Sequence, residues 1–171
     1  MEVYSTVLWH LGKVAKLSYL GQELIRLDKL APEAWCAVGN CFSLLKEHSN
    51  AVKFQRSIKL DPLFVYSYTL CGHEFVANDD LEQGMKYFRK AIQCNQRHYN
   101  AWYGLGMIFY RTQRLSLAAY HFERAVDVNP RSSALWSYRG MVFSKLKMWD
   151  KAEECLERSL ELNSKNMLAK S

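Results

Sequence analysis

Apolar residues recur along this chain at helical spacing, in segments that come in pairs. Trp35, Gly39 and Phe42 stand at i, i+4 and i+7, and residues so spaced share one face of an α-helix. After a short polar interval a second apolar stretch carries a small residue at Ala51 and a bulky one at Phe54. Small residues let two helices approach closely, and a bulky residue fills the space between them. The pattern therefore predicts a helical hairpin.

The hairpin recurs four times at a nearly constant period. Its glycines are separated by 33, 34 and 34 residues, at Gly39, Gly72, Gly106 and Gly140. The bulky residue of each second helix follows at Phe54, Phe88, Phe122 and Leu156. Paired helices at a period near 34 are typical of the tetratricopeptide repeat, and one hairpin cannot bury its apolar face alone. The sequence therefore predicts an all-α fold, a right-handed α-solenoid of tetratricopeptide (TPR) helix-turn-helix repeats.

The same marks set the expected boundaries. First helices are predicted over 33–45, 65–77, 99–111 and 133–145. Second helices are predicted over 49–60, 81–94, 115–128 and 149–162. A degenerate leading hairpin at 1–31 precedes repeats at 32–64, 65–98, 99–132 and 133–166, and 167–171 starts a further helix or tail. The first full repeat is one residue short between Ala51 and Phe54, which we expect to displace its second helix. Because the end lacks a polar capping helix, we expect a segment of a longer solenoid or self-association.

Composition and charge narrow the function classes. The net charge is +6, from 23 basic and 17 acidic residues. Basic residues are scattered over every helix and interleaved with acids, whereas nucleic-acid binding favours a concentrated stripe. An RNA-associated repeat protein would need such a stripe on its inner wall, so no nucleic-acid partner is predicted. No run of about 18 apolar residues indicates a membrane span. Residues 1–11 lack a secretory signal, which favours the cytosol or nucleus.

Catalytic and metal-binding patterns are weak. The G-x-G of residues 103–107 lies inside a helical pattern without a preceding strand, which disfavours phosphate binding. His73-Glu74 lacks the second histidine of a helical zinc site, because position 77 is alanine. The five cysteines are odd in number and form no Cys-x-x-Cys pair, which indicates reduced, packed thiols. We predict no enzyme activity, no metal and no cofactor, and keep an enzyme only as a residual hypothesis.

The first helices of stacked hairpins line a concave face, where a peptide groove is expected. Candidate positions lie three before, one after and four after each glycine. The predicted groove residues are Asn40, Ser43, Thr69, His73, Tyr103, Met107, Tyr110 and Ser137, with Arg111 and Lys145 at the edge. Asn40 suits peptide amides, the tyrosines and Met107 suit an apolar side chain, and the two cations suit a carboxylate.

Four segments carry a more specific resemblance. MEVYSTVLWHL (1–11), APEAWCAVGNCFSL (31–44), YSYTLCGHEFV (66–76) and RHYNAWYGLGMIFY (97–110) closely resemble the C-terminal repeats of the cell division cycle protein 27 family. Proteins of this family are the third subunit of the anaphase-promoting complex, or cyclosome. The resemblance is strong from about residue 1 to 130 and fades over the last repeat, which keeps only the generic pattern.

This resemblance implies a non-catalytic scaffold of a ubiquitin ligase that acts in cell division, in the nucleus and also the cytoplasm. It implies protein partners: other subunits of the complex, and coactivators whose Ile-Arg C-terminal tails enter the groove. Asn40 and the His73–Glu74 neighbourhood fall in the matching motifs. Glu74 or Glu33 would pair with the tail arginine, and Asn40 with a cation would hold the terminal carboxylate. The full-length family protein forms a homodimer through N-terminal repeats that are absent here, so dimerisation is not carried over.

A second reading stays open. A general tetratricopeptide adaptor that binds a peptide tail outside that complex, for example a chaperone-type clamp, would share the fold. Such clamps usually carry a Lys/Asn set across successive first helices. Here the positions that match Asn40 are His73, Met107 and Met141, which disfavours this alternative.

Overall fold

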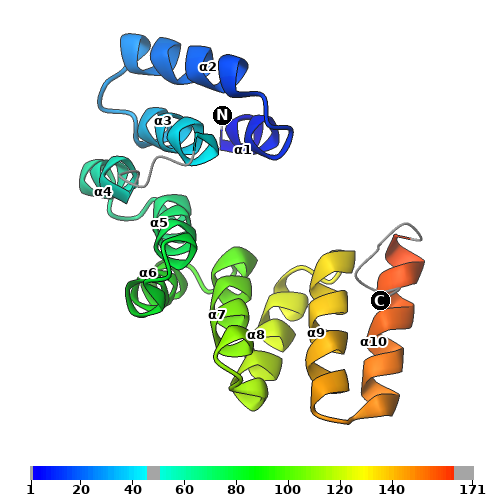
Figure 1. The fold of residues 1–171 in the computed structure, drawn as a ribbon. Helices are drawn as coiled ribbons and strands as arrows, with labels where there is room; N and C mark the ends of the chain where they lie inside the picture. The colour runs from blue at the N-terminus through cyan, green and yellow to red at the C-terminus, as the bar shows by residue number, and fades with distance from the viewer. Residues whose placement is uncertain (1, 46–50, 164–171) are drawn as a thin grey trace. The chain divides into compact units, whose positions relative to one another are not determined.

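The computed structural model describes residues 2–45 and 51–163, and these residues form ten helices and no strand. In chain order (Figure 1) they are α1 Glu2–His10, α2 Val14–Leu27, α3 Pro32–Leu44, α4 Ala51–Leu60, α5 Val65–Ala77, α6 Leu81–Cys94, α7 Tyr99–Arg111, α8 Leu115–Val128, α9 Ser133–Lys145 and α10 Trp149–Leu162. Where both bounds are described, each helix of the four full repeats starts and ends within one residue of its prediction. The predicted start of α4 at 49 and the predicted further helix at 167–171 lie outside the described residues.

The chain divides into two compact units, which we call the N-terminal unit (residues 1–94) and the C-terminal unit (residues 95–171). The N-terminal unit holds three helix pairs, α1 to α6, and the C-terminal unit holds two, α7 to α10. Within each unit a second helix packs on its own partner and on the next first helix, as α8 packs on both α7 and α9. In the described part of the chain, no helix combines the length and apolar character needed to cross a bilayer.

Each repeat glycine is the point where two paired helices touch. A Cβ atom placed on Gly39 would lie 2.3 Å from the Phe54 ring, and one placed on Gly72 would lie 2.6 Å from the Phe88 ring. Both rings are buried against the glycine of their own pair. Phe54 therefore occupies the same place as Phe88, although its repeat is one residue short. The predicted displacement of this helix is therefore wrong for the Phe54 contact. The missing residue lies before Phe54 in the sequence, so the residue that touches the glycine keeps its place.

The aromatic residue four positions before each glycine ties its helix to the preceding loop. The indole N–H groups of Trp35, Trp102 and Trp136 each donate to the carbonyl oxygen six residues earlier, at 2.9 Å. Tyr68 donates its hydroxyl to the equivalent carbonyl of Pro62 at 3.1 Å. Tryptophan and tyrosine exchange at this position because each has an apolar body and one hydrogen-bond donor at its tip.

A buried polar network joins the helices of the N-terminal unit. The Ser57 hydroxyl donates to the Pro32 carbonyl at 2.8 Å and lies 2.6 Å from the Ser67 hydroxyl. The Cys36 thiol lies 3.2 Å from the same Ser67 oxygen. The partners satisfy one another, which lets polar groups occupy a dry interface at little cost. Ser159 repeats the arrangement in the C-terminal unit, where it donates to the Ser133 carbonyl at 2.7 Å.

The five cysteines are free, and four of them are buried. Burial raises the pKa of the Cys71 thiol, with smaller contributions from Cys36 and Glu74. Because the thiolate is the reactive form, we expect iodoacetamide at pH 8 to modify half-buried Cys94 well before Cys36 or Cys71. Peptide mapping by mass spectrometry would follow the order, with labelling of all five cysteines in urea as the control. Equal rates for Cys71 and Cys94 in the native protein would contradict this assignment.

Candidate functional site

The exposure of a candidate residue depends on its angle from the repeat glycine. At about 100° per residue, the position three before the glycine lies about 60° from it and the position one after lies about 100° from it. Thr69 and Ser137, both three before a glycine, are buried. Ser137 lies 2.8 Å from the Ser159 hydroxyl of α10, and Thr69 donates to the Tyr66 carbonyl at 2.8 Å. Ser137 is therefore placed in the packing of α9 on α10, and Thr69 is buried with its hydroxyl bonded to its own helix.

In the N-terminal unit, α1 covers part of the predicted surface. Asn40 is buried, and its amide lies 3.4 Å from the Ser5 hydroxyl, to which it donates. The hydroxyls of Thr6 on α1 and Tyr66 on α5 hydrogen-bond each other. Helices α1 and α5 thus meet on the side of α3 that carries Asn40, and this contact leaves the Asn40 amide little open surface.

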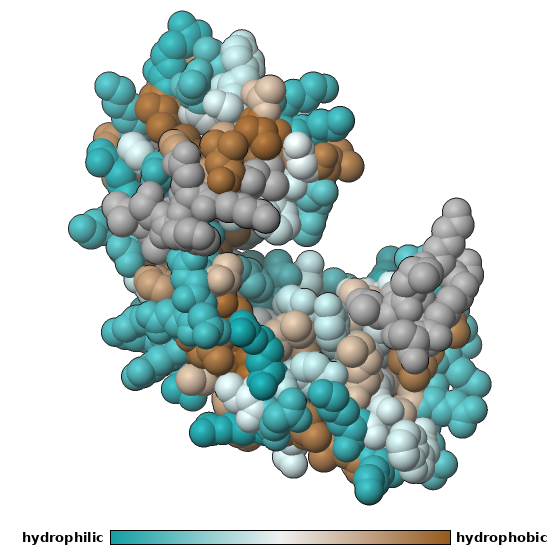
Figure 2. All heavy atoms as spheres, viewed as in Figure 1, coloured by the Kyte–Doolittle hydropathy of each residue, from teal (hydrophilic) through white to brown (hydrophobic). Residues whose placement is uncertain are grey.

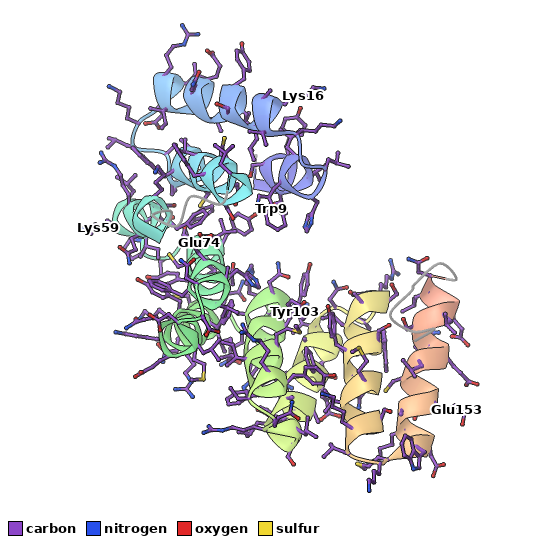
Figure 3. The ribbon with its side chains drawn as sticks, viewed as in Figure 1. Trp9, Lys16, Lys59, Glu74, Tyr103 and Glu153 are labelled. Atoms are coloured by element: carbon purple, nitrogen blue, oxygen red, sulfur yellow. The ribbon has the colours of Figure 1, made fainter. Side chains whose placement is uncertain are left out.

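The other candidates of this unit differ in exposure. Glu74 is buried on α5 (Figure 3), whereas Ser43 is half-buried and His73 is exposed. The His73 ring meets the edge of the Phe88 ring, with centroids 4.9 Å apart. His73 and Ser43 are therefore the candidates of this unit that offer open polar surface.

In the C-terminal unit, two of the predicted groove residues contact each other. Lys145 on α9 places its ammonium 4.2 Å from the centroid of the Tyr110 ring on α7, a cation–π distance. Met107 is half-buried on the same helix as Tyr110, and Arg111 is exposed at the end of that helix. Half-buried rings and thioethers with cations at their edge suit an apolar side chain that lies next to a carboxylate. We call Tyr103, Met107, Tyr110, Arg111 and Lys145 the α7–α9 surface.

Tyr103 lies on α7 (Figure 3) and packs against aromatic rings of α8 and α9. Its ring lies 5.3 Å from the Tyr138 ring and 6.1 Å from the Phe122 ring, measured between centroids. Burial raises the pKa of the Tyr103 hydroxyl, and a hydrogen bond with Tyr138 raises it further. Tyr103 therefore remains a neutral phenol and contributes shape to the surface without charge.

Four residues near these candidates were not predicted from the sequence: Tyr66, Tyr138, Ser5 and Thr6. Tyr66 lies six positions before Gly72, which is about 120° from the glycine and on the same side as His73. Extending the set of positions by one turn would have found it. The roles of Ser5 and Thr6 have no such signal, because they arise from the packing of α1 on α3 and α5. Among the described residues, no group of three or more His, Cys, Asp or Glu side chains is arranged to hold a metal ion.

Comparison with known proteins adds family information. Two family models described as tetratricopeptide repeat match residues 72–132 and 133–166. The chain is similar to solved structures of MamA (TM-score 0.71, 16% identity, 85% of each chain) and of YrrB, titled a TPR protein with an unusual peptide-binding site (TM-score 0.66, 17% identity, 98% of this chain and 87% of that one). These likenesses confirm the all-α tetratricopeptide solenoid fold.

Curated relatives are more similar in sequence. Anaphase-promoting complex subunit 3 of Schizosaccharomyces pombe is 56% identical over 115 residues, which are 67% of this chain and 17% of that protein. Protein bimA of Emericella nidulans is 50% identical over 119 residues, 69% of this chain and 15% of that protein. Cell division cycle protein 27 homolog B of Arabidopsis thaliana is 49% identical over 121 residues, 70% of this chain and 16% of that protein. This chain spans less than a fifth of the length of each relative, and it belongs to the cell division cycle protein 27 family of tetratricopeptide-repeat proteins.

Proposed function

We propose that this chain is a non-catalytic scaffold segment of an anaphase-promoting complex, a ubiquitin ligase, in the nucleus and cytoplasm. The observation that carries the proposal is the identity of 49–56% with three family members over about two thirds of the chain. The packing marks occupy only five positions of each repeat of about 34 residues. Identity at this level therefore extends well beyond the residues that a tetratricopeptide fold needs, which favours shared partners over a shared fold alone.

We further propose that the inner surface holds the C-terminal tail of a partner protein that ends in Ile-Arg. The α7–α9 surface supports this role chemically. An isoleucine side chain would pack on Tyr110 and Met107, and the terminal carboxylate would pair with Lys145 or Arg111. In this arrangement the recognition energy comes from apolar burial together with one charge-assisted hydrogen bond.

The test uses fluorescence polarisation with a labelled peptide that ends in Ile-Arg. Amidation of its C-terminus is expected to weaken binding about tenfold or more, because a charged hydrogen bond contributes about 1.5–3 kcal/mol. A peptide in which alanine replaces the arginine keeps the carboxylate and measures the contribution of the arginine side chain separately. Equal binding of the three peptides would remove tail capture and leave the family assignment untouched.

Two variants of the chain locate the tail. Lys145→Met is expected to reduce affinity about tenfold, whereas Lys16→Met removes an equal charge from the exposed side of α2 and should leave affinity unchanged. Asn40→Ala tests the other location. If the tail lies on the N-terminal unit, the peptide would replace Ser5 as the partner of the Asn40 amide, and Asn40→Ala would lower the affinity. Loss of binding in Asn40→Ala but not in Lys145→Met would overturn the assignment to the α7–α9 surface.

A further inference from the structure

An open groove runs along the second helices of the N-terminal unit. It lies between α4 and α6, with a cavity volume of about 750 Å³. Its floor includes Ile58 of α4, Tyr68 of α5 and Tyr87 of α6. The rim on α6 carries Lys86, Arg89 and Lys90. We call this the outer basic groove. It belongs to second helices, whereas the tail surface proposed above belongs to first helices.

The helices that border the groove are strongly basic. Helix α4 carries three cations and no acid, and α6 carries three cations and one acid, Glu82. Lys86, Arg89 and Lys90 are spaced three and four residues apart, so they project from one face of α6. Lys59 points outward from α4 (Figure 3), and hydrophilic side chains cover the outer sides of both helices (Figure 2).

Four of these cations form no ion pair in the part of the chain that the structure describes. Among the residues that the structure describes, Lys59, Lys86, Arg89 and Lys90 take part in none of the ion pairs. The other two cations of α4 lie on aromatic rings, with Lys53 at 3.8 Å from the Phe42 centroid and Arg56 at 4.2 Å from that of Trp35. Unpaired like charges along one groove create a positive potential that attracts an anionic partner.

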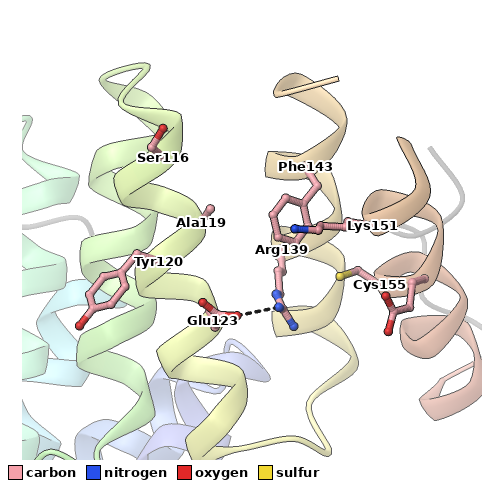
Figure 4. Close-up of a pocket in the computed structure, with 9 residues that line it drawn as sticks. Ser116, Ala119, Tyr120, Glu123, Arg139, Phe143, Lys151 and Cys155 are labelled. Carbon is pink, nitrogen blue, oxygen red and sulfur yellow. Dashed lines mark hydrogen bonds and ion pairs between the residues drawn. The ribbon is translucent and has the colours of Figure 1, made fainter. Parts of the chain in front are cut away.

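The C-terminal unit shows that this charge pattern is not a general property of the repeat. The hollow beside its second helices, lined by residues of α8, α9 and α10, also contains cations (Figure 4). There Arg139 pairs with Glu123 at 2.9 Å, and Glu154 lies in the same hollow as Lys151. Charges of both signs thus balance in that hollow, whereas the outer basic groove has one acid against its rim of cations.

The floor of the outer basic groove favours a polypeptide over a nucleic acid. The Tyr87 ring stacks on Phe75, with centroids 5.2 Å apart and planes at 14°, and its hydroxyl accepts from Gln55 at 2.9 Å. Tyr68 is buried and donates to the Pro62 carbonyl. Tyr68 is buried and one face of Tyr87 is covered by Phe75, so the floor offers no row of open rings on which successive bases would stack. A fixed apolar floor between cations instead fits an apolar side chain flanked by carboxylates.

We propose that the outer basic groove binds an acidic segment of another polypeptide. Carboxylates of the segment pair with Lys86, Arg89 and Lys90, and an apolar side chain between them packs on Ile58 and Tyr87. This surface is independent of the tail-binding proposal, because it uses other helices and another chemistry.

Fluorescence polarisation with the full chain tests the proposal. The probe is a fluorescein-labelled twelve-residue peptide of Glu and Asp with a central leucine. It is expected to bind, to weaken as salt rises, and to lose at least about tenfold in affinity in the triple variant Lys86→Glu, Arg89→Glu, Lys90→Glu. The matched control is Lys13→Glu, Lys16→Glu, Lys29→Glu, which changes the net charge equally at exposed positions of and beside α2. This control is expected to retain most of the affinity, and circular dichroism verifies the fold of both variants.

Four results would overturn the proposal. Equal loss of affinity in the two triple variants would assign binding to net charge alone. Equal binding of a peptide in which glutamine replaces the acids would remove the role of the carboxylates. Tighter binding of a single-stranded oligonucleotide, lost in the α6 variant, would make the groove a nucleic-acid site. Self-association that the α6 variant abolishes, measured by analytical ultracentrifugation, would place a second copy of the chain in the groove.

Discussion

Replacing Phe122 by alanine is expected to lower the free energy of unfolding of the chain by about 3–5 kcal/mol. The Phe122 side chain is 0% exposed. Its ring stacks on Tyr138, with centroids 5.7 Å apart, and one of its carbons lies 2.8 Å from where a Cβ of Gly106 would be. Alanine removes this apolar area and leaves a cavity that the surrounding helices fill only in part. Urea unfolding followed by circular dichroism measures the loss.

A matched substitution on the same helix separates packing from helix propensity. Leu117 lies on α8 and is 44% exposed, so Leu117→Ala is expected to change stability by less than about 0.5 kcal/mol. Phe122→Leu is expected to be milder than Phe122→Ala, because Leu156 fills the equivalent place beside Gly140. A loss below 1 kcal/mol for Phe122→Ala would contradict the view that this ring joins the helix pair.

The second large effect is expected from Gly106→Ala, which should destabilise the chain by about 1–3 kcal/mol. The added methyl group would lie 2.8, 2.9 and 3.0 Å from three carbons of the Phe122 ring, closer than carbon atoms pack. The ring is enclosed by its neighbours, so the two helices must separate. This cost opposes the gain of about 1 kcal/mol that alanine brings over glycine inside a helix. Urea unfolding again measures the difference.

A double-mutant cycle tests the cause of that loss. If the clash with Phe122 is responsible, Gly106→Ala should cost less in a Phe122→Leu background, because a flexible leucine can turn away from the new methyl group. The two substitutions would then be coupled energetically. Equal costs in both backgrounds would show that the glycine matters for another reason, such as local backbone geometry.

The helices were predictable because their signal is local. Gly72 and Phe88 mark the contact point of one helix pair. The aromatic residue four positions before each glycine bonds to the preceding loop, as Trp102, four before Gly106, does to Gln96. Each mark depends only on helical periodicity and on side-chain size. The same marks recur at a constant spacing in four hairpins, so the pattern does not depend on any one of them. A single residue missing before Phe54 therefore did not obscure it.

The candidate site was less predictable. Tyr110 and Lys145 belong to the predicted set and lie together in the structure, because both project from the exposed side of first helices. Thr69 and Ser137 belong to the same set and are buried. Thr69, Ser137 and Tyr110 satisfy the angular rule used for the groove, and Lys145 was added at its edge. Helical periodicity alone therefore does not separate the exposed positions from the buried ones. Burial is decided by contacts with other helices, as Ser159 of α10 shows where it meets Ser137.

The all-α class, the period of the hairpins and the helix bounds are encoded locally, because they follow from the spacing of apolar and small residues along one chain. Which polar residues remain exposed depends instead on the tertiary structure. It covered Asn40 with α1, and it placed Lys86, Arg89 and Lys90 of α6 in one groove with Ile58 of α4. Solvent exposure and electrostatic potential depend on neighbours that are distant in sequence, and no spacing rule within one helix contains that information.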